Sequence, residues 1–416
     1  MLTGKTQYGL QYAVKRSNSA ACYCALSIKC GTRDEHDYHD GIAHFVEHTL
    51  FKGTSRRKAS AINGYLDKLG GELNAFTTKE EIVLHATVLK EDFNKAASLL
   101  FELAACPSFP EHEVEIEKGV ILDEIQSYKD TPSEDIYDKF EEMLFEGHPL
   151  SSNILGTRAS VKKISREELM NFVREKFMAC KMAFTVVADI DEKKMEKAIL
   201  KLADKHLIQE DCNTCSCTSF PFPCGDYKTP QATPFDKTLN KRNHQANCII
   251  GGLAPSLYQE KERIATVLLC NILGGPANNS ILNSILREKN GWVYSVECGY
   301  TQFSDTGMVT ISLGCDKSNV DKCINSIYKE IARLQEQPLS ESRLKAAKKQ
   351  LLGQMAISGD NGETQCLSMG KALLAYGKIN SGKENRALIE AITAEDICQA
   401  AREVFDSTKL SKLLYI

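Results

Sequence analysis

Two histidines and a glutamate at helical spacing are the residues of this sequence best suited to chemistry. His44, Glu47 and His48 lie in the segment GIAHFVEHTLF, residues 41–51. Residues four apart share one face of an α-helix, so His44 and His48 would project together with Glu47 beside them. Two imidazoles and a carboxylate suit a catalytic zinc site that keeps one position open for water, whose proton a nearby carboxylate can take. The alternative is an exposed polar helix face, and these five positions alone do not decide between the two.

Composition limits the classes of protein to which the chain can belong. It has 416 residues, of which 43% are apolar and 25% charged, as in ordinary globular proteins of two or three domains. The net charge of −4 gives no overall attraction to nucleic acid or to an anionic membrane. No run approaches the ~18 apolar residues that span a bilayer, and the N-terminus lacks a hydrophobic signal core. We therefore predict a cytoplasmic protein with neither a membrane nor a nucleic-acid partner.

Cysteine is abundant, with sixteen residues in the chain. Most stand singly inside apolar runs, where a reduced cysteine acts as a small hydrophobe. The exception is a cluster inside the proline-rich stretch 209–236, which we interpret as an interdomain linker. The cluster lacks the two-plus-two spacing of a zinc ribbon, so its thiols are open to metal binding, pairing or remaining free. Its members are Cys212, Cys215, Cys217 and Cys224.

The pattern around the motif predicts a sheet with helices packed against it. Alternating strands are expected at 10–15, 22–30, 72–78 and 81–88, and helices at 59–69, 91–105 and 111–128. Asp40 stands where it can cap the helix that carries the His-Glu-His set.

A third metal ligand must come from elsewhere in the chain. Glu117 and Glu124 lie seven apart on the helix 111–128, so they share a face. Glu124 is next to apolar Ile125, which points it toward packed structure. The alternative for each is a solvated helix glutamate.

The second half repeats the element order of the first. Leu339–Met355 resembles Phe109–Ile125, with Gln354 at the place of Glu124, and no second H-x-x-E-H occurs. We predict an α+β protein of two duplicated αβ domains, each a mostly antiparallel sheet packed with helices. The expected ranges are a zinc-binding domain at 1–208, the linker at 209–236, and a domain without metal ligands at 237–416.

Together these motifs resemble the pitrilysin/insulinase family of inverted zincins, whose H-x-x-E-H is the reverse of the commoner order, and in particular the short-chain branch with the mitochondrial processing peptidase. Glu124 lies 76 residues after His48, where the family places its third ligand, and Glu117 matches its supporting acid. Arg287 and Tyr294, in the segment LREKNGWVY, keep the seven-residue offset of the family's Arg/Tyr motif.

The resemblance implies a zinc metalloendopeptidase with one Zn²⁺ per chain. His44, His48 and Glu124 would be the metal ligands, Glu47 the general base, and Glu117 the residue that orients a ligand histidine. The strand formed by Asn74, Ala75, Phe76 and Thr77 would bind extended peptide by strand addition. Arg287 and Tyr294 would complete the site, although their residue types alone favour a surface ion pair and a half-buried strand tyrosine.

Family architecture implies a homodimer whose two chains close like a clamshell around a chamber that admits peptides or unfolded segments. Three other functions remain open: a non-catalytic scaffold, a heterodimeric subunit, and a module that binds peptides without cutting them. The segment 274–280 is only loosely like the family's glycine-rich loop, and Trp292 replaces a smaller aliphatic residue. Both departures concern fine specificity rather than the chemistry.

Overall fold

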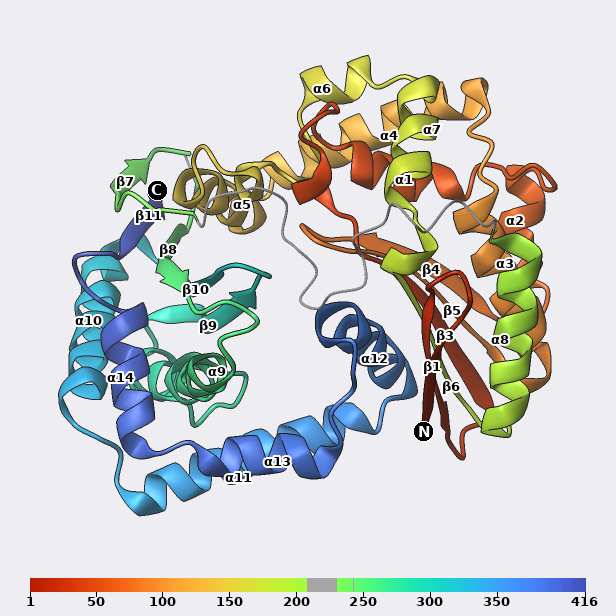
Figure 1. Cartoon of the computed structure of the whole chain (residues 1–416). Coiled ribbons are helices and arrows are strands. Elements are labelled where there is room, and N and C mark those ends of the chain that lie inside the picture. The colour runs from red at the N-terminus through yellow and green to blue at the C-terminus, as the bar shows by residue number, and fades with distance from the viewer. Residues whose placement is uncertain (208–229, 242) are drawn as a thin grey trace. The chain divides into compact units, whose positions relative to one another are not determined.

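The computed structural model describes residues 1–207, 230–241 and 243–416, in which the chain forms two compact units (Figure 1). Unit 1 holds the described residues of 1–126, 152–223 and 357–379, and unit 2 those of 127–151, 224–356 and 380–416. Each unit has one sheet with helices packed against it, which is the predicted α+β class. The cysteine cluster Cys212, Cys215, Cys217 and Cys224 lies outside the described residues.

The sheet of unit 1 has six strands in the order β1-β2-β6-β3-β5-β4. All neighbouring strands are antiparallel except β2 and β6. Within the described residues β4 lies at one edge of this sheet and pairs only with β5. The strands are β1 (Leu2–Lys5), β2 (Gln11–Arg16), β3 (Ala21–Ile28), β4 (Glu72–Thr77), β5 (Ile82–Leu89) and β6 (Met182–Ala188).

Helices cover both faces of this sheet. On one face, α3 buries Ala96, Leu99, Leu100 and Leu103, at the three- and four-residue spacing of a single helix face, against β3 and β5. The other face is covered by α12. The helices of unit 1 are α1 (Ile42–Leu50), α2 (Ala59–Asp67), α3 (Phe93–Ala105), most of α4 (Glu111–Lys129), α6 (Arg158–Lys163), α7 (Arg166–Lys176), α8 (Glu192–His206) and α12 (Gly362–Tyr376).

The sheet of unit 2 has five strands in the order β7-β11-β8-β10-β9. Its strands are β7 (Asp236–Leu239), β8 (Ala246–Ala254), β9 (Val293–Gln302), β10 (Gly307–Cys315) and β11 (Ser411–Tyr415). Its helices are α5 (Pro132–Leu144), α9 (Glu260–Gly274), a π-helical segment (Asn283–Lys289), α10 (Val320–Glu336), most of α11 (Glu341–Gly359), α13 (Gly382–Ala391) and α14 (Ala394–Val404).

The units exchange one helix each, so they differ from the predicted ranges 1–208 and 237–416. Helix α5 comes from the first half but packs its Phe140 into the core of unit 2 beside Tyr415. The Tyr415 hydroxyl donates to Oδ2 of Asp135 on this helix at 2.8 Å. Periodicity along the sequence does not reveal which sheet such a helix joins.

Helix α12 makes the reciprocal contribution from the second half to unit 1. Its Met369 and Leu373 pack in one cluster with Ala25 of β3, and the Thr185 hydroxyl of β6 donates to the Cys366 carbonyl at 2.9 Å. Each such buried side chain contributes about 1.5–3 kcal/mol of transfer free energy, which fixes the helix on this sheet.

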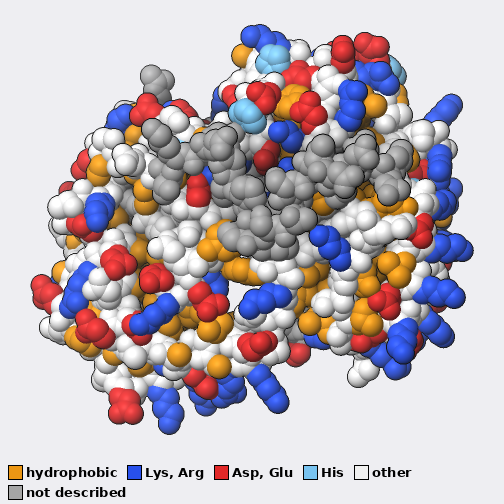
Figure 2. All heavy atoms as spheres, in the orientation of Figure 1, with side chains coloured by type: hydrophobic (Ala, Val, Ile, Leu, Met, Phe, Trp, Pro, Cys, Tyr) orange, Lys and Arg blue, Asp and Glu red, His pale blue; other side chains and the backbone are white. Residues whose placement is uncertain are grey.

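Helices in the described part of the chain all lack the combination of length and apolar character that a membrane span requires. The cysteines described there are free thiols, and all of them except Cys106 are buried. On the face shown in Figure 2, acidic and basic side chains both occur, in keeping with the small net charge.

Candidate metal centre

Helix α1 positions the motif by burying its other side chains. Phe45, Val46 and Leu50 are fully buried in the core of unit 1, which leaves His44, Glu47 and His48 on the remaining face. The two imidazole rings lie 4.5 Å apart between centroids. The helical spacing in the sequence therefore brings them together as predicted.

The start of α1 is fixed by a residue that the sequence did not single out. Both oxygens of the buried Glu35 carboxylate accept main-chain bonds there, from the N–H of Gly41 at 2.9 Å and of Ala43 at 2.8 Å. A carboxylate at a helix N-terminus satisfies otherwise unpaired donors. Gly41 itself is the N-cap, with φ of 90° and the Leu155 carbonyl 2.7 Å from where a Cβ would stand. Asp40 is therefore not the capping residue.

Helix α4 brings a third candidate ligand, Glu124, close to the two histidines. Oε2 of Glu124 lies 3.8 Å from Nε2 of His44 and 3.5 Å from Nε2 of His48. Zinc ligands at about 2.0–2.2 Å in tetrahedral geometry lie roughly 3.3–3.5 Å from one another, so this spacing fits the ion. In the portion of the chain that the structure describes, these three form the one group of His, Cys, Asp or Glu side chains close enough to hold a metal.

Glu117 fixes which nitrogen of His48 faces the metal position. Its Oε1 lies 2.8 Å from Nδ1 of His48, and since a carboxylate only accepts, Nδ1 carries the proton and Nε2 is free to bind a metal. Its Oε2 lies 2.7 Å from Nζ of Lys52 in an ion pair rather than a well-aligned hydrogen bond. Burial tends to raise the pKa of Glu117, but the contacts with His48 and Lys52 outweigh it, so the pKa is lowered.

The two histidines have opposite electrostatic environments. Burial, and then the proximity of His48, lower the pKa of His44 to about 3, which keeps this ring neutral. Burial also acts to lower the pKa of His48, but the bond to Glu117 and the nearby Glu47 and Glu124 raise it overall. A neutral imidazole is the form that binds metal.

Glu47 lies beside the metal position and is held by the edge strand. The Thr77 hydroxyl donates to Oε2 of Glu47 at 2.7 Å. Burial raises the pKa of Glu47, and the Thr77 bond only partly opposes this effect. A carboxyl with a raised pKa is better matched to accepting and returning a proton near neutral pH.

The four residues predicted to bind peptide all lie on β4, next to α1. Their exposure alternates, with Asn74 and Phe76 exposed, and Ala75 and Thr77 half-buried. The β4 edge that faces away from β5 is not paired to any described strand, which is what strand addition requires.

Arg287 and Tyr294 belong to unit 2. Arg287 is exposed on the π-helical segment, and Tyr294 is 57% exposed near the start of β9. The Tyr294 hydroxyl donates to Oδ1 of Asp316 at 2.9 Å. Tyr294 is thus more exposed than the half-buried tyrosine that its strand position alone would favour. Between the two, Trp292 is half-buried with Nζ of Lys322 5.8 Å from its ring centroid.

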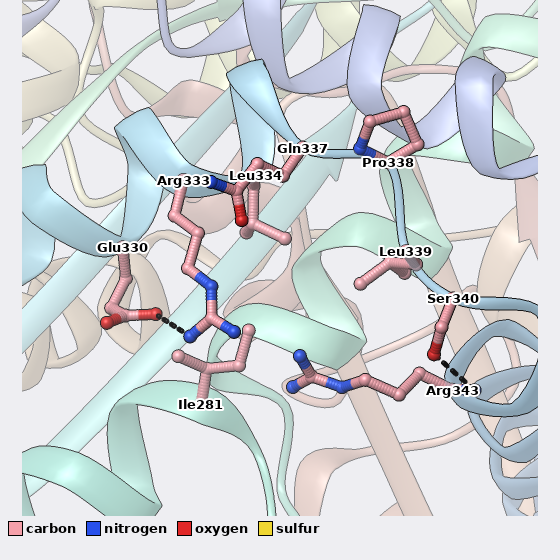
Figure 3. A pocket seen from close by; sticks show the side chains of 9 residues that line it. All are labelled: Ile281, Glu330, Arg333, Leu334, Gln337, Pro338, Leu339, Ser340 and Arg343. Atoms are coloured by element: carbon pink, nitrogen blue, oxygen red, sulfur yellow. Dashed lines mark hydrogen bonds and ion pairs between the residues drawn. The ribbon is translucent and has the colours of Figure 1, made fainter.

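In unit 2, a hydrogen bond between two neutral side chains lies where unit 1 has a candidate metal ligand. Gln354 of α11, at the position that corresponds to Glu124, accepts from the Asn271 amide at 2.6 Å. A hollow of about 250 Å³ elsewhere in this unit contains none of the predicted site residues (Figure 3). Arg333 and Arg343 extend into it from α10 and α11, and Ile281 also lines it.

Two residues that contact the site, Glu35 and Lys52, carry no distinct signal in the sequence. Glu35 is one of several charged residues in the loop RDEHD, residues 33–37, and its distance from the motif matches no helical or strand spacing. Lys52 follows the end of α1, where a basic side chain is already favoured by the helix dipole. Its contact with Glu117 spans 65 residues of sequence, and no local pattern signals it.

Two family models match the chain. Residues 12–158 match the model described as Insulinase (Peptidase family M16), and residues 163–351 match the Peptidase M16 inactive domain. The first range contains the candidate metal centre. The second covers much of unit 2, in whose described part no metal-binding group is found.

Relatives with similar sequences cover nearly the whole chain. An uncharacterized zinc protease of Rickettsia bellii is 28% identical and covers 97% of this chain and 94% of its own. The mitochondrial-processing peptidase subunit beta of Rattus norvegicus is 26% identical, over 93% of this chain and 78% of its own. A protease structure from Helicobacter pylori shares the fold with a TM-score of 0.89 at 17% identity, over 100% of this chain and 98% of that one. On this combination of motif, fold and family matches, the chain belongs to the insulinase family of peptidases, family M16.

Proposed function

We propose that this chain is a zinc-dependent endopeptidase that binds one Zn²⁺ through His44, His48 and Glu124. The observation that carries the proposal is the convergence of these three ligand atoms within 4.8 Å of one another, with the Glu47 carboxylate beside them. The names of the relatives, which include several zinc proteases, support the same chemistry.

Each residue near the metal has a part in peptide hydrolysis. A zinc ion held by His44, His48 and Glu124 would act as a Lewis acid and lower the pKa of a nearby water molecule. Glu47 would take a proton from a water molecule, whose oxygen forms a bond to the scissile carbonyl carbon. The C–N bond then breaks as Glu47 returns this proton to the leaving nitrogen, so that a carboxylic acid and an amine result, and the acid then passes its proton to the amine or to solvent. Glu117 keeps the His48 ring oriented throughout.

The substrate in this proposal is an extended peptide or an unfolded segment. It would pair with the free edge of β4 along Asn74–Thr77, where main-chain hydrogen bonds accept almost any sequence. This mode excludes folded proteins, whose strands are already paired.

A second chain is proposed to supply Arg287 and Tyr294. In a homodimer these two side chains would reach the partner's metal centre and stabilise the negative charge that develops on the carbonyl oxygen. The exposure of both side chains in unit 2 is compatible with such a role.

The test is a digest of a mixed peptide library by the wild-type protein and by Glu47→Gln, each with and without a chelator. We expect products from the wild type only, their loss with chelator, and their return when zinc is added. Glu47→Gln should bind zinc and cut nothing, since the amide cannot take the proton. A folded protein offered in parallel should stay intact, whereas its unfolded form should be cut.

Three other functions predict different experimental outcomes. A peptide-binding module would bind the library without products, and its binding would survive chelation. A non-catalytic scaffold would neither bind zinc stoichiometrically nor cut. A heterodimeric subunit would gain activity only with a partner, and the mass of the purified protein alone distinguishes this case from a homodimer.

A further inference from the structure

We propose that Thr77 is a positioning residue that couples peptide binding on β4 to the orientation of the Glu47 carboxylate. The inference rests on the proposed function, and it assigns to the Thr77 side chain a role other than contact with substrate. Thr77 is the last residue of β4, and its hydroxyl donates to Oε2 of Glu47 at 2.7 Å.

The main chain of Thr77 points away from β5, toward the free edge. The Thr78 N–H donates to the Glu81 carbonyl at 2.8 Å and so points toward β5, and the Thr77 carbonyl, which belongs to the same peptide group, points the other way. In the ladder of β4 and β5, Thr77 and Ile82 are therefore a non-hydrogen-bonded pair. In such a pair the N–H and C=O groups face outward, where an added strand would bond to them.

The side chain of Thr77 points in a different direction, toward α1. Side chains alternate across a strand, and Thr77 shares its face with the buried Ile82, whereas Phe76 projects on the opposite face. Thr77 is half-buried next to α1, and its branched Cβ restricts the rotation that brings Oγ1 to Glu47.

The bond holds one oxygen of Glu47 and leaves the other for the proton. Oε2 accepts from Thr77, and within the described residues Oε1 has no recorded hydrogen bond. A carboxylate with one oxygen fixed keeps the second aimed at a constant point. Misplacement of a catalytic group by about 1 Å can cost on the order of 100-fold in rate.

One residue therefore joins the two parts of the site. A peptide that pairs with the Thr77 main chain adds hydrogen bonds at the end of β4, and the resulting restriction of Thr77 passes through its hydroxyl to Glu47. Binding of a peptide to β4 and the orientation of the Glu47 carboxylate are therefore linked.

The experiment compares Thr77→Val, which removes the hydroxyl but keeps the branched shape, with Thr77→Ser, which keeps the hydroxyl. Thr87→Val on β5 is the matched control, because it makes the same change at a half-buried residue of the adjacent strand. Each variant is tested for cleavage of an unstructured fluorogenic peptide that the wild type cuts. The zinc-free proteins are also titrated with that peptide, and zinc content and thermal unfolding are measured.

We expect Thr77→Val to lower kcat about 10–100-fold while KM and the peptide Kd of the zinc-free protein stay within about twofold. Thr77→Ser should restore most of kcat, and Thr87→Val should match the wild type. Zinc content should be equal in all four proteins.

Three results would overturn the proposal: an unchanged kcat in Thr77→Val, a loss of peptide affinity that accounts for the whole effect, or a folded Thr77→Ser as slow as Thr77→Val. In each of these cases the wild type still cuts in a zinc-dependent manner, so the proposed function survives. A wild type that shows no zinc-dependent cleavage would instead overturn both.

Discussion

Glu117 holds the Nδ1 atom of His48 at 2.8 Å from a carboxylate oxygen, and this contact joins α4 to α1 behind the metal position. The turn that follows α1 strengthens the connection. Ser108 donates its N–H to the Gly53 carbonyl at 3.1 Å, and Thr54 and Glu102 are joined by a buried hydrogen bond of 2.7 Å. Lys52 lies at the start of this turn. Because these hydrogen bonds hold the turn in place, they also hold Lys52 beside Glu117.

Removing the charge of Lys52 should weaken zinc binding. Lys52→Met keeps the aliphatic stem but leaves Oε2 of Glu117 buried without a cation. The carboxylate then loses a contact that holds it in its orientation toward His48. Loss of such an outer contact typically costs about 10–100-fold in metal affinity. Competition with a chromophoric chelator measures the change.

The controls for this prediction are Lys52→Arg and Lys118→Met. The arginine keeps the positive charge and should hold affinity near the wild-type value. Lys118 pairs with Glu115 on its own helix at 2.7 Å, and its loss should leave zinc affinity unaltered. Equal affinities for Lys52→Met and Lys118→Met would show that the ion pair has no influence on the metal.

Zinc should stabilise the wild-type protein against heat. A ligand that binds only the folded state adds about 2.7 kcal/mol at a concentration 100 times its Kd, which corresponds to a shift of several degrees in Tm. His44→Ala removes one ligand and should lose most of this shift, although its metal-free form still folds. Scanning fluorimetry with chelator and then with added zinc follows the change, and a shift of equal size in His44→Ala would contradict the assigned ligand.

Mixed dimers should recover activity if two chains share each site. Glu47→Gln and Arg287→Ala are expected to be inactive or severely impaired alone. When the two are co-expressed with different affinity tags, the doubly purified heterodimer has one site with both an intact Glu47 and an intact Arg287. About half of the wild-type activity per dimer is expected, and no recovery at all would exclude the composite site.

Unfolding should become easier in acid partly because of His206. This residue is 4% exposed, and both ring nitrogens lack a hydrogen-bond partner in the described structure. Burial, followed by the positive charges of Lys205, Arg56 and Arg57, lowers its pKa, and Glu102 opposes the shift only in part. The unfolded chain binds a proton at a pKa of about 6.5, before the folded one does, so stability is complete above that pH and is lost as the pH falls below it.

His206→Phe should flatten this pH dependence, since phenylalanine keeps the ring beside Phe101 but has no proton to bind. The difference in slope is at most about 1.4 kcal/mol per pH unit, the value for one proton. Urea unfolding of zinc-free protein at pH 7.5, 6.5 and 5.5 measures it, with the exposed His112→Gln as control. Parallel pH profiles for the wild type and His206→Phe would contradict the prediction.

Residues close together in sequence account for most of what could be predicted. The spacing of His44 and His48 implied a shared helix face, and Glu117 and Glu124 on α4 implied a second one, because helical geometry alone fixes both. The antiparallel pair β4 and β5 followed from alternation around a short turn. The repeated order of elements showed that the second half lacks the ligands, and Gln354 indeed bonds to Asn271 there.

Contacts between distant segments could not be predicted in this way. Periodicity indicates which face of α5 or α12 is apolar. It does not indicate that α5, from the first half of the sequence, packs against the sheet of unit 2, or that α12, from the second half, packs against the sheet of unit 1. The same limit applies to the contacts of Glu35 with the start of α1 and of Lys52 with Glu117, because both depend on how distant segments pack together.

The sequence by itself determined the chemical groups of the site and the helices that carry them, because residue type and helical period are local properties. The tertiary structure alone decided that Glu124 meets both histidines, that Thr77 holds Glu47, and that Lys52 neutralises Glu117. These contacts depend on where α1, α4 and β4 pack against one another, and that packing is set by the whole core of unit 1 rather than by any one segment.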